Sequence, residues 1–243
     1  MFTDYKPAVH LNQVSYIIDG NKILKRITGS FPEGKITTLV GPSGAGKTTL
    51  LKLCNGLLSP SSGELYVKGQ PINSYEPTEL RRLVGIALQS APMVSGTVYD
   101  NLALPMELQS KKLSADAAKQ LLHDVGLEEE FMHRKVSDLS GGQRQKVSIA
   151  RTLVNRPDIL LLDEITSSLD RTSLKEIEEL IAAINRKYKT TIIWITHNLQ
   201  QALEIGDFTW VMMEGEVIET GESELLKSPA TDKVRHFVKG GAV

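Results

Sequence analysis

At residues 41–48 the sequence reads Gly41-Pro42-Ser43-Gly44-Ala45-Gly46-Lys47-Thr48, and this stretch determines the fold class. The residues directly before it, including Ile36, Leu39 and Val40, are apolar and predict a buried strand. The residues directly after it predict a mostly buried helix, with apolar side chains at Leu50, Leu51, Leu53, Cys54, Leu57 and Leu58. A strand, a glycine-rich loop and a helix in this order predict an α/β fold.

The stretch fits the pattern G-x-x-x-x-G-K-[ST], which is typical of a phosphate-binding loop. Its glycines let successive backbone N–H groups turn toward a phosphate, and the start of the following helix adds donors and a positive dipole end. Lys47 supplies a full charge for the outer phosphates, and the Thr48 hydroxyl is a ligand for Mg²⁺. The alternative is a glycine-rich turn before an ordinary helix, but every fixed position and both flanking elements favour the phosphate loop.

Composition and charge narrow the possible functions of the 243-residue chain. With 28 Lys and Arg against 29 Asp and Glu, no large basic field favours nucleic-acid binding. Cys54 is the only cysteine, which excludes an internal disulfide and fits a reducing compartment. No apolar run reaches membrane-spanning length, and Met1–Lys6 lacks a signal-peptide pattern. We therefore expect a soluble, cytoplasmic protein whose membrane role comes through a partner.

The order of strand and helix signals predicts two kinds of sheet and a helical insert. Alternating patterns at Val9–Tyr16 and Ile23–Phe31, followed by a hairpin at Glu64–Ile72, indicate an antiparallel β portion beside a parallel sheet. From about residue 90 to 157 the signals are mainly helical, and strand signals then resume. We interpret the helical region as an insert rather than a separate domain.

A second glycine-rich segment opens a helix inside the insert. Ser140 and Gln143 of Leu139-Ser140-Gly141-Gly142-Gln143 have the spacing of a capping box. A cap explains Ser140 but leaves the two glycines unexplained, because each weakens a helix by about 1 kcal/mol relative to alanine. A bare helix start that contacts an anion would explain them.

Acidic residues and a histidine follow two further predicted strands. Asp163 and Glu164 end the apolar run Ile159–Leu162, and His197 follows the strand Thr191–Thr196. Acidic residues at the end of such a strand lie near a loop-bound ligand in α/β folds. Asp163 is therefore placed to hold Mg²⁺, directly or through water, and Glu164 to polarise an attacking water. A lone histidine after a strand is more often structural, so His197 gains weight only from the other motifs.

These motifs resemble the nucleotide-binding subunit of an ABC transporter over about residues 8–228. They occur in the family's order: the phosphate loop, Gln89 at the insert boundary, Leu-Ser-Gly-Gly-Gln at 139–143, Asp163-Glu164, the Ser-Leu-Asp turn ending at Asp170, and His197. The Leu-Ser-Gly-Gly-Gln segment is the most diagnostic, because other phosphate-loop ATPases lack it. The resemblance implies an α/β P-loop NTPase core with an antiparallel β subdomain and an inserted α-helical subdomain. It predicts a single ABC ATPase domain over 1–243, with the core and β subdomain at 1–89 and 158–243 and the signature-bearing insert at 90–157.

The resemblance also implies residue roles in an ATPase that uses ATP and Mg²⁺. Glu164 would be the catalytic base, His197 would contact the γ-phosphate, and Lys47 would complete the catalytic set. The ATP-binding residues would be Tyr16, Gly41, Ser43, Gly44, Ala45, Gly46, Lys47, Thr48, Thr49 and Gln89. Mg²⁺ would be held by Thr48, Gln89 and Asp163. In a head-to-tail dimer of two copies, the partner's ATP would be contacted by Ser140, Gly141, Gly142, Gln143 and Asp170.

By the same resemblance, ATP binding closes the dimer, hydrolysis opens it, and a separate polytopic membrane subunit converts that motion into solute transport. The chain would then lie on the inner face of the cell membrane, with no nucleic-acid partner. Asp163–Ser167 and Thr97–Leu102 look like those of an iron-efflux group within the family, and phosphate importers are a second possibility. Export and import are both compatible with these motifs.

The chain departs from the family pattern in three places. Ile18 stands where an aromatic residue is usual, and Tyr16 lies on the same strand face, where it could stack on adenine instead. Ile165 replaces a common proline and Ser168 a common alanine, and neither change removes a catalytic group.

Two other functions compete with transport. One is a soluble ABC-type ATPase in translation or DNA repair, but the chain has neither a second cassette nor a long coiled-coil insert. The other is a regulatory module without catalysis, against which the intact Lys47, Glu164 and His197 argue.

Overall fold

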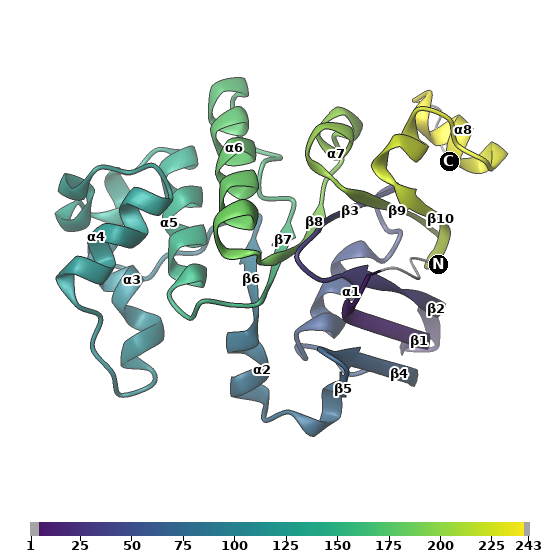
Figure 1. Cartoon of the computed structure of the whole chain (residues 1–243), viewed down its shortest axis with the longest axis horizontal. Helices are drawn as coiled ribbons and strands as arrows, with labels where there is room; N and C mark the ends of the chain where they lie inside the picture. Colours follow the sequence, from purple (N-terminus) through teal and green to yellow (C-terminus); the bar gives the residue numbers. More distant parts are fainter. Residues whose placement is uncertain (1–4, 241–243) are drawn as a thin grey trace.

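The computed structural model describes residues 5–240, so residues 1–4 and 241–243 of the predicted domain lie outside it. In this part of the chain, a small antiparallel sheet lies beside a larger sheet that is covered by helices (Figure 1).

The small sheet has the strand order β2-β1-β4-β5. Its strands are β1 (Pro7–Ile18), β2 (Asn21–Pro32), β4 (Ser62–Val67) and β5 (Gln70–Pro71). The predicted strands at Val9–Tyr16 and Ile23–Phe31 are confirmed as one long hairpin. The second hairpin begins at Ser62, two residues before the predicted start, and ends at Pro71, one residue before the predicted end. It ends there because Pro71 has no N–H to extend the ladder and Ile72 begins a 3₁₀ turn.

The large sheet has the strand order β10-β9-β3-β8-β7-β6. Its strands are β3 (Ile36–Val40), β6 (Val84–Leu88), β7 (Ile159–Asp163), β8 (Thr191–Ile195), β9 (Phe208–Met213) and β10 (Glu216–Glu222). All neighbouring strands are parallel except β9 and β10, which form a hairpin. Because β3, β8 and β7 are adjacent and parallel, the loops at their carboxyl ends meet at one edge of the sheet.

The helices are α1 (Lys47–Cys54), α2 (Pro77–Leu83), α3 (Val98–Glu107), α4 (Ala115–Asp124), α5 (Gly141–Leu153), α6 (Arg171–Tyr188), α7 (Leu199–Ile205) and α8 (Asp232–Val238). Helices α3, α4 and α5 lie together beyond the β6 edge, at the left of Figure 1. The helix after the phosphate loop ends earlier than predicted. Gly56 turns the chain with φ +68°, and Leu57 is left 48% exposed.

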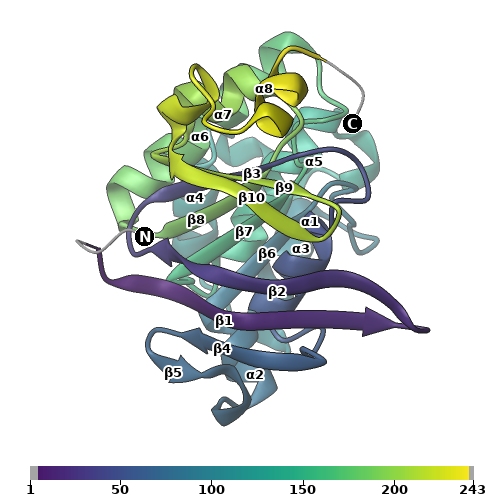
Figure 2. The same ribbon diagram turned by 90° about the vertical axis from the view of Figure 1, so that its right-hand side faces the viewer.

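Aromatic packing joins the two sheets. Trp210 of β9 stacks on Phe31 of β2 with ring centroids 4.4 Å apart. A Cβ on Gly29 would lie 2.7 Å from the Trp210 ring, so only glycine lets β2 approach this closely. Figure 2 shows the resulting layers, with β9 and β10 above β1 and β2.

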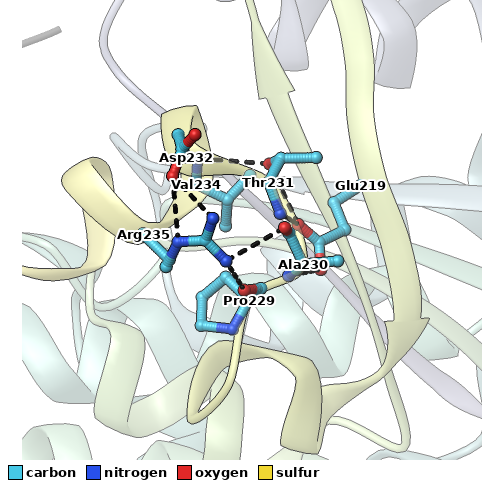
Figure 3. Close-up of polar contacts among 7 residues, drawn as sticks. All are labelled: Glu219, Pro229, Ala230, Thr231, Asp232, Val234 and Arg235. Carbon is cyan, nitrogen blue, oxygen red and sulfur yellow. Dashed lines mark hydrogen bonds and ion pairs between the residues drawn. The ribbon is translucent and has the colours of Figure 1, made fainter.

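One carboxylate fastens the C-terminal segment to β10. Glu219 accepts hydrogen bonds from the N–H of Ala230 at 2.8 Å and from the N–H and hydroxyl of Thr231 at 3.2 and 3.1 Å (Figure 3). Arg235 donates to the carbonyl oxygens of Pro229 and Ala230 at 2.9 and 3.0 Å. These bonds fix α8 on the β9–β10 hairpin.

Candidate functional site

The loop between β3 and α1 needs glycine at two positions. Gly41 has φ +145°, and a Cβ there would lie 1.9 Å from the Met212 carbonyl oxygen. Gly46 has φ +93° and caps α1, and a Cβ there would lie 2.7 Å from a methyl group of Leu24. Backbone approach and positive φ thus both exclude side chains at these two positions, so no side chain there blocks a ligand from the backbone of the loop.

Lys47 is the first residue of α1, and it is only 5% exposed. Its ammonium group donates to the carbonyl oxygens of Gly41 and Pro42, each at 2.8 Å. Burial lowers the pKa of Lys47, and the nearby carboxylates of Glu164 and Asp163 partly offset this effect. The charge therefore lies inside the loop, where an incoming phosphate would gain most from it.

Thr48 and Asp163 bring two oxygen ligands together at the same edge of the sheet. The Thr48 hydroxyl donates to Asp163 Oδ1 at 3.0 Å. Burial raises the pKa of Asp163, while the bond from Thr48 opposes that rise. Mg²⁺ takes one or two protein oxygens and completes its shell with waters and phosphate, so this pair fits it.

Glu164 and His197 form a close pair next to this site. His197 Nε2 lies 2.6 Å from Glu164 Oε1. Glu164 has φ +51°, a left-handed conformation that is strained for a residue with a side chain. Its backbone N–H donates to the Ile195 carbonyl oxygen of β8, so the strained residue is held between the ends of β7 and β8.

Gln89 follows β6, and its amide is engaged outside the Thr48–Asp163 pair. It donates to the Ser167 hydroxyl at 2.9 Å, and that hydroxyl donates to the Glu164 carbonyl oxygen, also at 2.9 Å. Ser167 is not among the site residues predicted from the sequence, because one serine in a turn carries no signal of its own. Its position three residues after Glu164 is the only clue.

The predicted capping box at the start of α5 is present. Ser140 accepts from the N–H of Gln143 at 3.2 Å, and the Gln143 side chain accepts from the N–H of Ser140 at 2.9 Å. Packing adds a second reason for Gly142, since a Cβ there would lie 2.8 Å from the Ser173 hydroxyl. A Cβ on Gly141 would meet nothing closer than 3.8 Å, so packing leaves this glycine unexplained.

Two predicted site residues have clear local roles. Asp170 caps α6 by accepting from the N–H groups of Thr172 and Ser173, each at 3.0 Å, and hydrogen bonds from Ser173 lower its pKa. Tyr16 is partly buried against the core beneath the β1–β2 hairpin, while Ile18 is 48% exposed. The structure thus brings Lys47, Thr48, Asp163, Glu164 and His197 to one edge, whereas the start of α5 lies against Leu169 and Ser173 at the start of α6.

Comparison with known proteins supports the same class. A family model described as ABC transporter matches residues 24–167, more than half of the chain. The ABC transporter ATP-binding protein YjkB of Bacillus subtilis (strain 168) is 43% identical over 240 residues, which cover 97% of this chain and 95% of that protein.

Solved structures agree with the sequence match. The structure of cbiO1 from Clostridium perfringens, part of the ABC transporter complex cbiONQ, has a TM-score of 0.84 at 28% identity and covers 96% of this chain and 99% of its own. The ATP-binding cassette MJ0796, a dimer in a post-hydrolysis state with ADP and Pi, has a TM-score of 0.77 at 30% identity and covers 88% of this chain and 98% of its own.

The fold and the phosphate-loop edge define an ATP-binding cassette. The chain belongs to the ABC transporter family, as an ATP-binding subunit with ATPase activity. Among residues 5–240, no helix is long and apolar enough to cross a membrane. The predicted fold class and family are therefore confirmed, whereas the roles of the individual residues remain predictions.

Proposed function

We propose that the chain works as a head-to-tail homodimer that hydrolyses two ATP molecules and drives a separate polytopic membrane subunit. We include in this proposal the single ABC ATPase domain, with its core at 1–89 and 158–243 and its insert at 90–157. The subunit would be cytoplasmic and bound to the inner face of the membrane. The solved structure of the cassette MJ0796 is dimeric, and cbiO1 is part of an ABC transporter complex, which supports both partners.

The observation that carries the proposal is the separation of two complementary half-sites. The phosphate loop follows β3, whereas the first turn of α5 lies against the start of α6 and the end of β6, where Gln145 approaches the Leu88 carbonyl oxygen. In the sheet, β8 and β7 lie between β3 and β6. Three strand spacings alone amount to about 14 Å. Ser140 and Gly141 are exposed at the start of α5. A second copy turned head to tail would place this helix start against the phosphate loop, where its N–H groups would stabilise the γ-phosphate.

Within each site we assign the chemistry as follows. Lys47 and the loop N–H groups bind the phosphates. Thr48 and Asp163 hold Mg²⁺, which supplies positive charge to the phosphate oxygens when it is bound. Glu164 orients and activates the attacking water, and His197, which lies 2.6 Å from it, contacts the γ-phosphate. Gln89 would exchange its Ser167 partner for the metal site once nucleotide enters.

For the membrane partner we propose contact with the segment 91–98. Pro92, Met93 and Val94 are consecutive apolar residues, Pro92 and Val94 are exposed, and Val94 is 50% exposed, which gives this segment an apolar surface for a partner. The loop is nevertheless well held. Asn101 bonds the N–H and carbonyl of Val94, each at 2.9 Å, and Arg151 donates to the Pro92 carbonyl oxygen at 2.7 Å. A cysteine crosslinker at Met93 should therefore capture a membrane protein, and crosslinks only within the chain would contradict the assignment.

For the solute we propose a metal ion, iron in particular, moved outward, with phosphate import as the second candidate. The support for iron is the amino-acid sequence of two segments, Asp163–Ser167 and Thr97–Leu102, which resemble those of the iron-efflux group. Reconstitution with the co-purified membrane protein, followed by a scan of solutes for stimulation of ATPase activity, tests both.

The dimer is tested with Glu164→Gln, which keeps the shape of the side chain but removes its basicity and charge. Loss of a general base lowers the rate by about 10²- to 10⁴-fold. The variant should still bind ATP, and it should run as a dimer in ATP and as a monomer in ADP by size-exclusion chromatography with light scattering. Adding Ser140→Arg should abolish the dimer. A silent variant that binds ATP but stays monomeric at high concentration would count against the two-site dimer.

A further inference from the structure

A buried amide connects the two segments that carry Glu164 and His197. Gln201 lies in α7, four residues after His197, and it is 1% exposed. Its amide nitrogen donates to Glu178 Oε1 of α6 at 2.8 Å. The same nitrogen lies 3.3 Å from the hydroxyl of Thr166, which follows Glu164 by two residues. One side chain of the helix after β8 therefore touches both the segment after β7 and α6.

The local structure makes these bonds important for the position of α7. The helix has only seven residues, too few to be stable without tertiary contacts. Asn198 caps it by accepting from the N–H groups of Gln200 and Gln201 at 3.0 and 3.2 Å. Ala202, the residue after Gln201, packs into the apolar cluster under β9. The Gln201 bonds are the polar contact in the described chain that ties this helix to α6 and to the Glu164 segment.

We infer that Gln201 is a positioning residue for the Glu164–His197 pair, because its bonds to Thr166 and Glu178 set the spacing between the two segments. The inference rests on the roles proposed above for Glu164 and His197. A side chain that only stabilised the fold would change the amount of folded protein and leave the turnover of each folded molecule alone.

Gln201→Leu tests this difference in the full-length chain. It removes the hydrogen bonds at similar volume, so we expect kcat for ATP to fall about 10- to 100-fold, the scale of small misplacements in an active site. KM for ATP should change less than about threefold, because the phosphate loop belongs to another element. Gln200→Leu is the matched control. Gln200 is exposed, and its side chain bonds only Glu204 of the same helix, so kcat should stay at the wild-type value.

Exchanging the two partners separates positioning from general damage. Gln201→Glu alone places a carboxylate against that of Glu178, and kcat should fall as in Gln201→Leu. Glu178→Gln alone places two amides, at 178 and 201, where they can still form a hydrogen bond, so most of the ATPase activity should remain. The double variant restores one carboxylate and one amide, so kcat should return to within about threefold of wild type.

Each outcome decides the inference. Wild-type kcat in Gln201→Leu, or a folded double variant that remains as slow as Gln201→Glu, would overturn it. Glu164→Gln in the same assay tests the proposed base separately. Loss of turnover in Glu164→Gln together with wild-type kcat in Gln201→Leu would overturn only the positioning role, whereas wild-type turnover in Glu164→Gln would overturn the proposed function of the base.

Discussion

The two glycines at the start of α5 give opposite predictions when each is changed to alanine. Glycine-to-alanine changes in a helix stabilise by up to about 1 kcal/mol. Gly141→Ala should keep this gain, because the nearest atom to its Cβ is a Leu169 methyl group at 3.8 Å. For a protein of this size, the melting temperature should rise by about 2–4 °C. In Gly142→Ala the new Cβ would lie 2.8 Å from Ser173 Oγ and 3.0 Å from Ser173 Cβ. Overpacking costs about 1–3 kcal/mol, so this variant should be up to about 2 kcal/mol less stable than wild type.

Thermal unfolding without nucleotide measures these differences, and steady-state ATPase assays on the same samples measure function. If the helix start contacts the partner's ATP, Gly141→Ala should be more stable than wild type and yet hydrolyse ATP more slowly. Equal stability of the two variants would refute the packing account of Gly142. Wild-type turnover in the stabilised Gly141→Ala protein would refute the close approach of this glycine to phosphate.

Three further variants or probes test other parts of the structure. Lys47→Ala should fold but lose useful ATP binding or turnover, and wild-type ATPase activity in this variant would refute the role of the lysine. Although burial raises the pKa of Asp124, hydrogen bonds from Lys187, Tyr188 and Gln120 outweigh burial and lower it. Asp124→Asn should therefore be less stable than wild type in urea titrations at neutral pH, and the difference should shrink as the pH falls below the ordinary value of 3.8. Burial raises the pKa of Cys54 to about 12, so iodoacetamide at pH 8 should modify it only in the unfolded chain.

Much of the site could be predicted because it follows from strand ends. Asp163 and His197 lie at or just after the ends of β7 and β8, and the loop that leads to Lys47 starts at the end of β3. Parallel strands bring such positions to one edge whatever the loops do. The predicted end of α1 was wrong, and the reason is physical. Leu57 and Leu58 continue the apolar pattern, but the turn at Gly56 and its φ of +68° override that pattern.

The polar contacts that support the site could not be predicted from the sequence. Gln89 meets Ser167 across 78 residues, and Thr166 meets Gln201 across 35. Single glutamines and serines in turns and short helices have no periodicity that would pair them. Only the order of the strands brings them together, and that order depends on packing of the whole chain.

The central place of β3 has a consequence for synthesis on the ribosome. Ile36 of β3 is paired with Ile192 of β8, and Thr37 with Phe208 of β9. Translation at about 5–20 residues per second takes roughly 8–30 s to add the intervening stretch. The β1–β2 hairpin can form during that interval, because its partners are neighbours in the chain. The phosphate loop emerges early, but β3 has no strand on either side until β8 and β9 have been made, so ATP can assist folding only after synthesis has reached Met213.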